Sequence, residues 1–231
     1  MTSKISGKKL VICLMVITAV LITVTGIVYE QSLLRILPLY ISLVIAFLQS
    51  RVNRFAPLLG GINSVLYAIV YLYYGLYASA IYAIIISGPL QILTFFHWRK
   101  RAYGQSVVLK HMNWKGRVAN LIAFSFALAA LHWIMSALGS NHTLFDNLSS
   151  LLGGWVTVLT LFAYVEYTWL MIPAGLCNIG LYISMLEETP EQMTYLIYAI
   201  YGLVCSSIAV FQARKLWNAQ NSSTKSIEET M

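Results

Sequence analysis

The sequence predicts an all-α integral membrane protein with eight transmembrane helices: one N-terminal helix and two parallel three-helix repeats joined by a linker helix (1+3+1+3). Three observations predict this class. First, the 231 residues are 59% hydrophobic and only 10% charged, whereas soluble domains carry roughly 25% charged residues. Second, long apolar runs recur along the chain, and the basic residues gather on one side of them. Third, short motifs of the first half return in the second half.

Eight apolar segments are each long enough to cross the roughly 30 Å hydrocarbon layer of a bilayer as a helix. Clusters of polar or charged residues separate them. The predicted spans are residues 10–28, 33–50, 57–75, 77–97, 118–137, 147–165, 168–186 and 192–213. The first span follows three lysines, as the apolar core of a signal peptide would, but it is longer than such a core and lacks a clear cleavage site. We therefore expect a retained helix.

The distribution of charge predicts how the chain is oriented. If the N-terminus is cytoplasmic, every basic residue except Arg35 falls in a cytoplasmic segment. The acidic residues on the outer side are Glu30, Asp146, Glu187, Glu188 and Glu191. This is the positive-inside pattern, and it predicts that both termini are cytoplasmic. The net charge of +7 is then a topology signal with contact to lipid headgroups, and no nucleic-acid partner is expected.

The two repeats are predicted from matching motifs at matching spacing. The paired segments are NSVLY (63–67) and NIGLY (178–182), IYAI (81–84) and IYAI (197–200), and FHWRK (96–100) and FQARK (211–215). An even number of spans separates the two basic exits, so the repeats have the same orientation and an odd helix lies between them. Parallel repeats occur in transporters, where substrate sites lie near the midplane between the repeats. The alternative is coincidence in a chain rich in Leu and Tyr.

These features divide the chain into five parts. The parts are an N-terminal helix (1–30), a first three-helix repeat (31–100), a basic cytoplasmic loop with the linker helix (101–140), a second repeat (141–217) and a polar tail (218–231) that we expect to be disordered.

A binding site between the repeats would consist mainly of neutral polar groups. Asn63, Gln91, Thr94 and Asn178 fall within spans, where their amides and hydroxyls could bind a solute or tie helices together. Glu166 either faces the bundle centre, where a carboxylate is functional by default, or lies at the cytoplasmic interface. Because no chain of carboxylates crosses the bilayer, a facilitator of an uncharged or weakly charged solute is favoured over an ion-coupled carrier.

Aromatic side chains provide a second kind of candidate. Tyr67, Trp155, Trp169 and Tyr182 lie in or near spans, and their rings suit a flat heteroaromatic ligand, including a cationic one. The same rings also serve packing. Trp98 stands beside a basic exit and is expected to be an interface anchor.

The prolines and histidines give less information about function. Pro89 and Pro173 interrupt spans, either as hinges or as plain kinks. The histidines show no metal-ligand spacing and the chain carries no catalytic motif that we know. No metal, cofactor or enzymatic activity is therefore expected.

Residues 54–100 read RFAPLLGGINSVLYAIVYLYYGLYASAIYAIIISGPLQILTFFHWRK. This stretch, and the run from Tyr164 to Trp217 that ends in ARKLW, resembles the PnuC family of vitamin transporters. The resemblance implies a three-plus-one-plus-three helix fold related to SWEET carriers, with an additional N-terminal helix. It also implies a homotrimer in a bacterial inner membrane. The implied activity is facilitated diffusion of nicotinamide riboside, made effectively one-way by phosphorylation in the cytoplasm. Relatives carry thiamine, riboflavin or deoxynucleosides.

The resemblance places pocket-lining polar groups at Asn63 and Gln91 in the first repeat and at Glu166 and Trp169 in the second. The nicotinamide riboside carriers have two tryptophans three residues apart in this helix, followed by an asparagine; here Ile172 stands three residues after Trp169. The first hypothesis is therefore a nicotinamide riboside carrier, the second a carrier of thiamine, riboflavin or a deoxynucleoside, and the third a membrane scaffold without transport.

Overall fold

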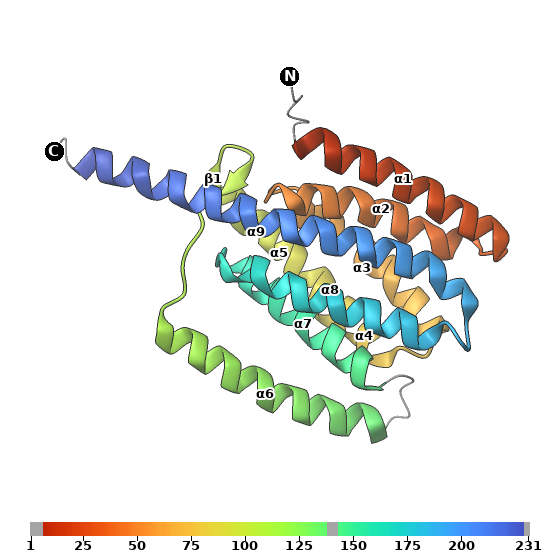
Figure 1. The fold of residues 1–231 in the computed structure, drawn as a ribbon. Helices are drawn as coiled ribbons and strands as arrows, with labels where there is room; N and C mark the ends of the chain where they lie inside the picture. Colours follow the sequence, from red (N-terminus) through yellow and green to blue (C-terminus); the bar gives the residue numbers. More distant parts are fainter. Residues whose placement is uncertain (1–6, 138–142, 229–231) are drawn as a thin grey trace.

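In the computed structural model of the chain, residues 7–137 and 143–228 are described. Within them, eight helices are long and apolar enough to cross a membrane, and they lie roughly side by side (Figure 1). The elements are α1 (Gly7–Val28), α2 (Leu33–Ser50), α3 (Ala56–Tyr73), α4 (Tyr77–Ile81), the π-helical segment η1 (Tyr82–Ser87), α5 (Gly88–Lys100), β1 (Ala102–Tyr103), β2 (Ser106–Val107), α6 (Trp114–Ala137), α7 (Thr143–Leu161), α8 (Glu166–Met185), the short 3-10 helix η2 (Pro190–Gln192) and α9 (Met193–Glu228). This arrangement confirms the predicted fold class.

The two ends of the bundle differ in charge. At one end, α2 is followed directly by Arg51, α5 ends at Lys100, and α6 begins; we call this the basic end. At the other end, α7 begins near Asp146 and η2 carries Glu191; we call this the acidic end. In Figure 1 the basic end is on the left, where α1 begins and α9 ends.

Six helices form a closed ring. The pairs α2–α3, α3–α5, α5–α7, α7–α8, α8–α9 and α9–α2 each pack against one another. The first repeat is α2, α3 and the continuous span from α4 to α5; the second is α7, α8 and α9. The remaining long helices lie outside the ring: α1 packs on α2 and α9, and α6 packs on α7, so that the two occupy opposite margins in Figure 1.

The fourth span contains a widened turn at the predicted break. Residues Tyr82–Ser87 are π-helical, immediately before Gly88 and Pro89. Proline has no N–H to donate, and its ring crowds the carbonyl four residues earlier, so the preceding turn opens. Pro173, by contrast, lies within an uninterrupted α8.

Several helix boundaries differ from the predicted spans, and two of these differences involve tertiary contacts. The sixth span was expected to reach residue 165, but α7 ends at Leu161. Ala163 has a positive φ of 58°, and this turn pairs with Lys110: Lys110 N donates to Ala163 O, and Val165 N donates to Lys110 O, each at 2.8 Å. The loop thereby closes onto the segment that leads to α6.

The tail after residue 217 was expected to be disordered, and this is wrong through Glu228, where α9 ends. A tertiary contact fixes the helix beyond the bundle. The buried amide of Gln220 donates to Val107 O and accepts from Leu109 N, both at 3.0 Å. These bonds satisfy one backbone group of β2 and one of the loop that follows it, so the hairpin fixes α9 at Gln220.

Candidate functional site

A cavity of about 280 Å³ lies inside the helical ring. Its lining comes from α2, α3, η1, α5, α7, α8 and α9. It extends from Asn53 and Pro57, in and after the turn between α2 and α3, to Tyr71 and Tyr182 deeper in the bundle. Small-molecule sites occupy about 300–1,000 Å³, so this cavity suits a ligand at the lower end of that range.

The cavity has an uncharged, aromatic wall. None of the described residues that line it is Asp, Glu, Lys, Arg or His. The lining tyrosines are Tyr67, Tyr71, Tyr82, Tyr167, Tyr182 and Tyr198. Each ring offers a π-face for a flat or cationic group, and each phenol offers a hydrogen-bonding hydroxyl.

Hydrogen bonds between helices hold several of these side chains in place. Ser42 Oγ donates to the hydroxyl of Tyr67 at 3.0 Å, and the Tyr67 ring stacks on Tyr71 with centroids 5.4 Å apart. The hydroxyl of Tyr82 lies 3.1 Å from Thr157 Oγ1 across the two repeats. Because these rings are fixed before any ligand arrives, binding orders few side chains.

Gln91 sits in a space left by a glycine. A Cβ atom on Gly60 would lie 1.7 Å from Gln91 Oε1, so only glycine allows this position of the amide. Gln91 Nε2 donates to Ser87 Oγ, which is 2.9 Å from Ser64 Oγ. This chain of polar groups ties α3 to the widened turn of the fourth span and directs the amide along the cavity wall.

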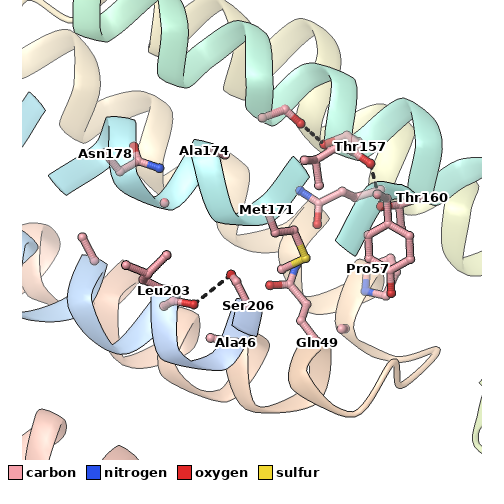
Figure 2. Close-up of a pocket in the computed structure, with 18 of the residues that line it drawn as sticks. Ala46, Gln49, Pro57, Thr157, Thr160, Met171, Ala174, Asn178, Leu203 and Ser206 are labelled. Atoms are coloured by element: carbon pink, nitrogen blue, oxygen red, sulfur yellow. Dashed lines mark hydrogen bonds between the residues drawn. The ribbon is translucent and has the colours of Figure 1, made fainter. Parts of the chain in front are cut away.

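Five of the residues nominated from sequence line the cavity. They are Tyr67, Gln91, Thr94, Asn178 and Tyr182. Figure 2 shows Asn178 on α8, on the opposite side of the cavity from Leu203 and Ser206 of α9. Asn178 makes no side-chain hydrogen bond to another described residue, so its amide is available to a ligand. The hydroxyl of Thr94 donates to Leu90 O, which leaves its oxygen only as an acceptor.

Asn63 lies outside the cavity and has a structural role. It is 2% exposed, and its Nδ2 donates to Pro38 O at 2.9 Å and to Ser42 Oγ at 2.8 Å. Pro38 lies within α2, so Asn63 joins α3 to α2. The two asparagines at equivalent motif positions therefore differ: Asn63 ties helices together, and Asn178 faces the cavity.

Trp155, Glu166 and Trp169 lie around a different cavity, outside the ring. Helical periodicity explains the separation. On α8 the cavity-lining residues are Tyr167, Met171, Ala174, Gly175, Asn178 and Tyr182, which lie along one face of the helix. Glu166 and Trp169 fall on another face. Glu166 pairs with Arg117 and His111 at the basic end, each at 2.9 Å. Of the two positions expected from sequence, it therefore takes the one at the end of the bundle and not the one at the bundle centre.

Several lining residues were not nominated from sequence. Trp98, expected to be an interface anchor, is 2% exposed, lines the cavity, and donates from Nε1 to Thr160 O at 2.7 Å. This bond joins the two repeats. Tyr167 and Met171 could have been found by stepping back from Asn178 in helical turns. Nothing in the local sequence signals that Trp98 turns inward.

Two three-helix repeats that enclose an uncharged cavity within a multi-span membrane protein are the architecture of a membrane transporter. The chain belongs to the nicotinamide mononucleotide transporter family, whose model matches residues 32–215. This assignment confirms the resemblance noted in the sequence.

The chain is also similar to a solved structure described as the crystal structure of the vitamin B3 transporter PnuC. The TM-score is 0.77 at 18% sequence identity, and the match covers 89% of this chain and 90% of that one. This likeness shows a shared fold. No curated protein matches the chain.

Proposed function

We propose that this protein carries nicotinamide riboside across the membrane by facilitated diffusion. The observation that carries the proposal is the uncharged cavity inside the ring, walled by tyrosines and by the amides of Gln91 and Asn178. The family description names a nicotinamide nucleotide, and the solved relative is described as a vitamin B3 transporter. Both support a nicotinamide-bearing solute.

The charge of the cavity favours the riboside over its phosphate ester. Phosphate is bound in proteins by Arg, Lys or clustered N–H donors, and the described lining offers no basic side chain. A phosphate would lose its hydration without a counter-charge, which is costly. The nicotinamide of the riboside is a ring cation, and the faces of Tyr67, Tyr71 and Tyr182 attract such a ring. Its carboxamide and ribose hydroxyls match Gln91, Thr157 and Asn178.

The direction of net transport follows from chemistry outside the protein. Because the described lining holds no ionisable acid or base other than tyrosine phenols, the solute moves down its own gradient, and phosphorylation in the cytoplasm traps it. We place the basic end in the cytoplasm of a bacterial inner membrane, because the positive-inside rule puts Lys- and Arg-rich segments there. Assembly as a homotrimer is part of the same proposal, and it rests on the family resemblance.

A second candidate substrate is thiamine, with riboflavin and deoxynucleosides behind it. The observation in its favour is that α8 presents Tyr167 and Met171 to the cavity, while Trp169 lies outside. The tryptophan pair expected of nicotinamide riboside carriers is therefore absent from this wall, and another heteroaromatic cation would find the same tyrosine faces. A scaffold without transport is disfavoured by the presence of the cavity.

Calorimetry on the purified full chain tests the proposal. The panel is nicotinamide riboside, nicotinamide mononucleotide, thiamine, riboflavin and a deoxynucleoside. We expect nicotinamide riboside to bind best, and Gln91→Ala to weaken binding about tenfold through loss of a hydrogen bond in a dry site. Phe211→Ala, at a side chain that is 75% exposed on α9, is the matched control and should bind normally. Preferred binding of thiamine would transfer the assignment to the second candidate, and tight binding of the mononucleotide would contradict the charge argument.

A further inference from the structure

A second cavity, of about 490 Å³, lies outside the helical ring. It is enclosed by the first half of α6, the second half of α7, the start of α8 and the segment that precedes α6. Three residues nominated for the substrate site, Trp155, Glu166 and Trp169, line this cavity instead. In Figure 1 the start of α6 stands apart from the ring at this end.

The cavity is polar at its mouth and apolar in its depth. His111, Arg117 and Glu166 stand at the basic end, where α6 and α8 begin. From Arg117 to Phe124 the helix rises about 10 Å toward the middle of the span, and the lining there is Phe124, Leu152 and other apolar groups. This gradient follows the helix axes, as the gradient from headgroup to acyl chain does in a bilayer.

One hydrogen bond and one ring contact fix the indole of Trp155 within this gradient. Trp155 Nε1 donates to Asn120 Oδ1 at 3.1 Å, and its ring meets Phe124 edge-on with centroids 5.6 Å apart. Trp169 is 54% exposed beside it on α8. Two tryptophans near the membrane surface offer rings to a headgroup or an ammonium group.

The two carboxylate oxygens of Glu166 differ in their hydrogen bonding. Its Oε1 accepts from Met112 N at 3.0 Å and from Arg117 Nη2 at 2.9 Å, and it also pairs with His111. Its Oε2 is buried and has no hydrogen-bond partner among the described residues. A buried acceptor without a partner is costly. Because rotation of the carboxylate exchanges its two oxygens, a donor that enters the cavity can bind this group.

We propose that this cavity binds a membrane phospholipid whose headgroup carries both a phosphate and a primary amine. The ammonium group donates to Glu166 and lies against the rings of Trp155 and Trp169. The phosphate pairs with Arg117, and an acyl chain occupies the apolar depth beside Phe124. A soluble ligand would not match a cavity that becomes more apolar along the membrane normal. The bound lipid joins α6 to the ring, which α6 otherwise contacts mainly through α7.

Native mass spectrometry of the purified full chain tests this proposal. The probes are phosphatidylethanolamine and phosphatidylglycerol with identical acyl chains, because only the first carries an amine. We expect the wild-type chain to retain phosphatidylethanolamine about tenfold more strongly, the effect of one charge-assisted hydrogen bond. Glu166→Gln should abolish this preference, and Trp169→Leu should weaken retention. Trp133→Leu, on the same α6 at a side chain that is 76% exposed and does not line the cavity, is the matched control.

Glu166→Gln also removes an ion pair, so each variant is checked for cooperative thermal unfolding. If Glu166→Gln does not fold, Trp169→Leu decides the question, since it leaves the ion pair intact. Equal retention of the two lipids by the wild-type chain, or a preference that survives both variants, would overturn the proposal. Displacement of the lipid by nicotinamide riboside would mark the cavity as a soluble-ligand site and would also overturn it. These readouts do not depend on transport, so they are distinct from those of the proposed function.

Discussion

Arg35 and Glu191 join the two repeats at the acidic end, with Arg35 Nη1 2.7 Å from Glu191 Oε2. Arg35 lies on α2 and Glu191 lies in η2, just before α9. The hydroxyl of Tyr74 donates to the other carboxylate oxygen at 3.1 Å, and the Arg35 guanidinium lies 3.7 Å from the centroid of the Tyr73 ring. Burial, and then the negative charge of Glu191, raise the pKa of Tyr74, so this phenol remains a neutral donor.

This ion pair stands over a layer of packed side chains. Tyr74, Leu76, Leu181, Met185 and Tyr195 are buried in one apolar cluster, between the cavity and the acidic end. A solute in the cavity is therefore separated from the acidic side by this cluster and by the ion pair. Carriers built from two repeats work by rocking one repeat against the other, so a contact between the repeats at one end governs opening at that end.

We predict that Glu191→Gln favours opening at the acidic end. A partly buried ion pair contributes about 1 kcal/mol, which shifts a two-state equilibrium about fivefold. The measurement is the maleimide labelling rate of a single cysteine at Val70, a buried position in the same cluster, after Cys13, Cys177 and Cys205 are replaced. Glu187→Gln, at an exposed position of the same end, should leave the rate unchanged. An unchanged rate in Glu191→Gln would show that the ion pair does not control opening.

Asp146 forms a second link between the repeats at the acidic end, and its substitution should lower the stability of the protein. Asp146 of α7 is 0% exposed and accepts from Ala78 N and Ser79 N, each at 3.2 Å, and from Ser79 Oγ. The carboxylate thus caps the start of α4, where unpaired N–H groups attract negative charge. Asp146→Asn should lower the free energy of unfolding by about 2 kcal/mol, measured by denaturant titration in detergent. A loss below about 0.5 kcal/mol would contradict the capping role.

Alanine substitutions at the two motif asparagines should have different effects, one on stability and the other on ligand affinity. Asn63→Ala removes two buried hydrogen bonds between α3 and α2 and should cost about 1–3 kcal/mol of stability, while ligand affinity of the folded fraction stays the same. Asn178→Ala should lower affinity and leave the melting temperature unchanged. Calorimetry and thermal unfolding of the two variants measure both quantities. If Asn63→Ala lowered affinity at unchanged stability, the assignment of Asn63 to packing would be wrong.

A substitution at Gly60 should lower ligand affinity by displacing the side chain of Gln91. In Gly60→Ala the new methyl group would overlap Gln91 Oε1, so the amide must leave its position and ligand affinity should fall about tenfold. Gly154→Ala is the matched control, because its Cβ would meet Tyr82 at an ordinary 3.8 Å. Equal affinities of the two variants would mean that Gln91 does not contact the ligand.

Transport should be insensitive to the proton gradient. The described cavity lining contains no carboxylate, amine or imidazole, so no lining group changes protonation between about pH 6 and 8. Uptake into proteoliposomes held at zero membrane potential should therefore be the same with and without an imposed pH gradient. Uptake driven by an imposed pH gradient would show that an ionisable group outside the lining takes part in transport.

The sequence by itself determined the membrane class, the eight spans and the two repeats, because these depend on local hydropathy and on charge at the ends of spans. It also brought Tyr67, Gln91 and Asn178 to attention, since polar and aromatic groups inside apolar spans are uncommon enough to notice. The existence of α6 between the repeats follows from the odd number of helices needed between two parallel repeats, whereas its position outside the ring comes from its packing on α7.

Only the tertiary structure decided which side chains share the cavity. Tyr167 and Trp169 are two residues apart on α8 and point to different cavities, because each residue of an α-helix is rotated by about 100° from the one before it, so residues two apart lie on nearly opposite faces. Trp98 and Trp155 are both tryptophans near the basic end. Trp98 lines the cavity inside the ring, whereas Trp155 lines the second cavity, outside the ring. Composition and spacing do not distinguish them. The distinction comes from how the six ring helices are rotated about their axes, and that rotation is set by contacts between residues far apart in the chain, such as Asn63 with Pro38 and Trp98 with Thr160.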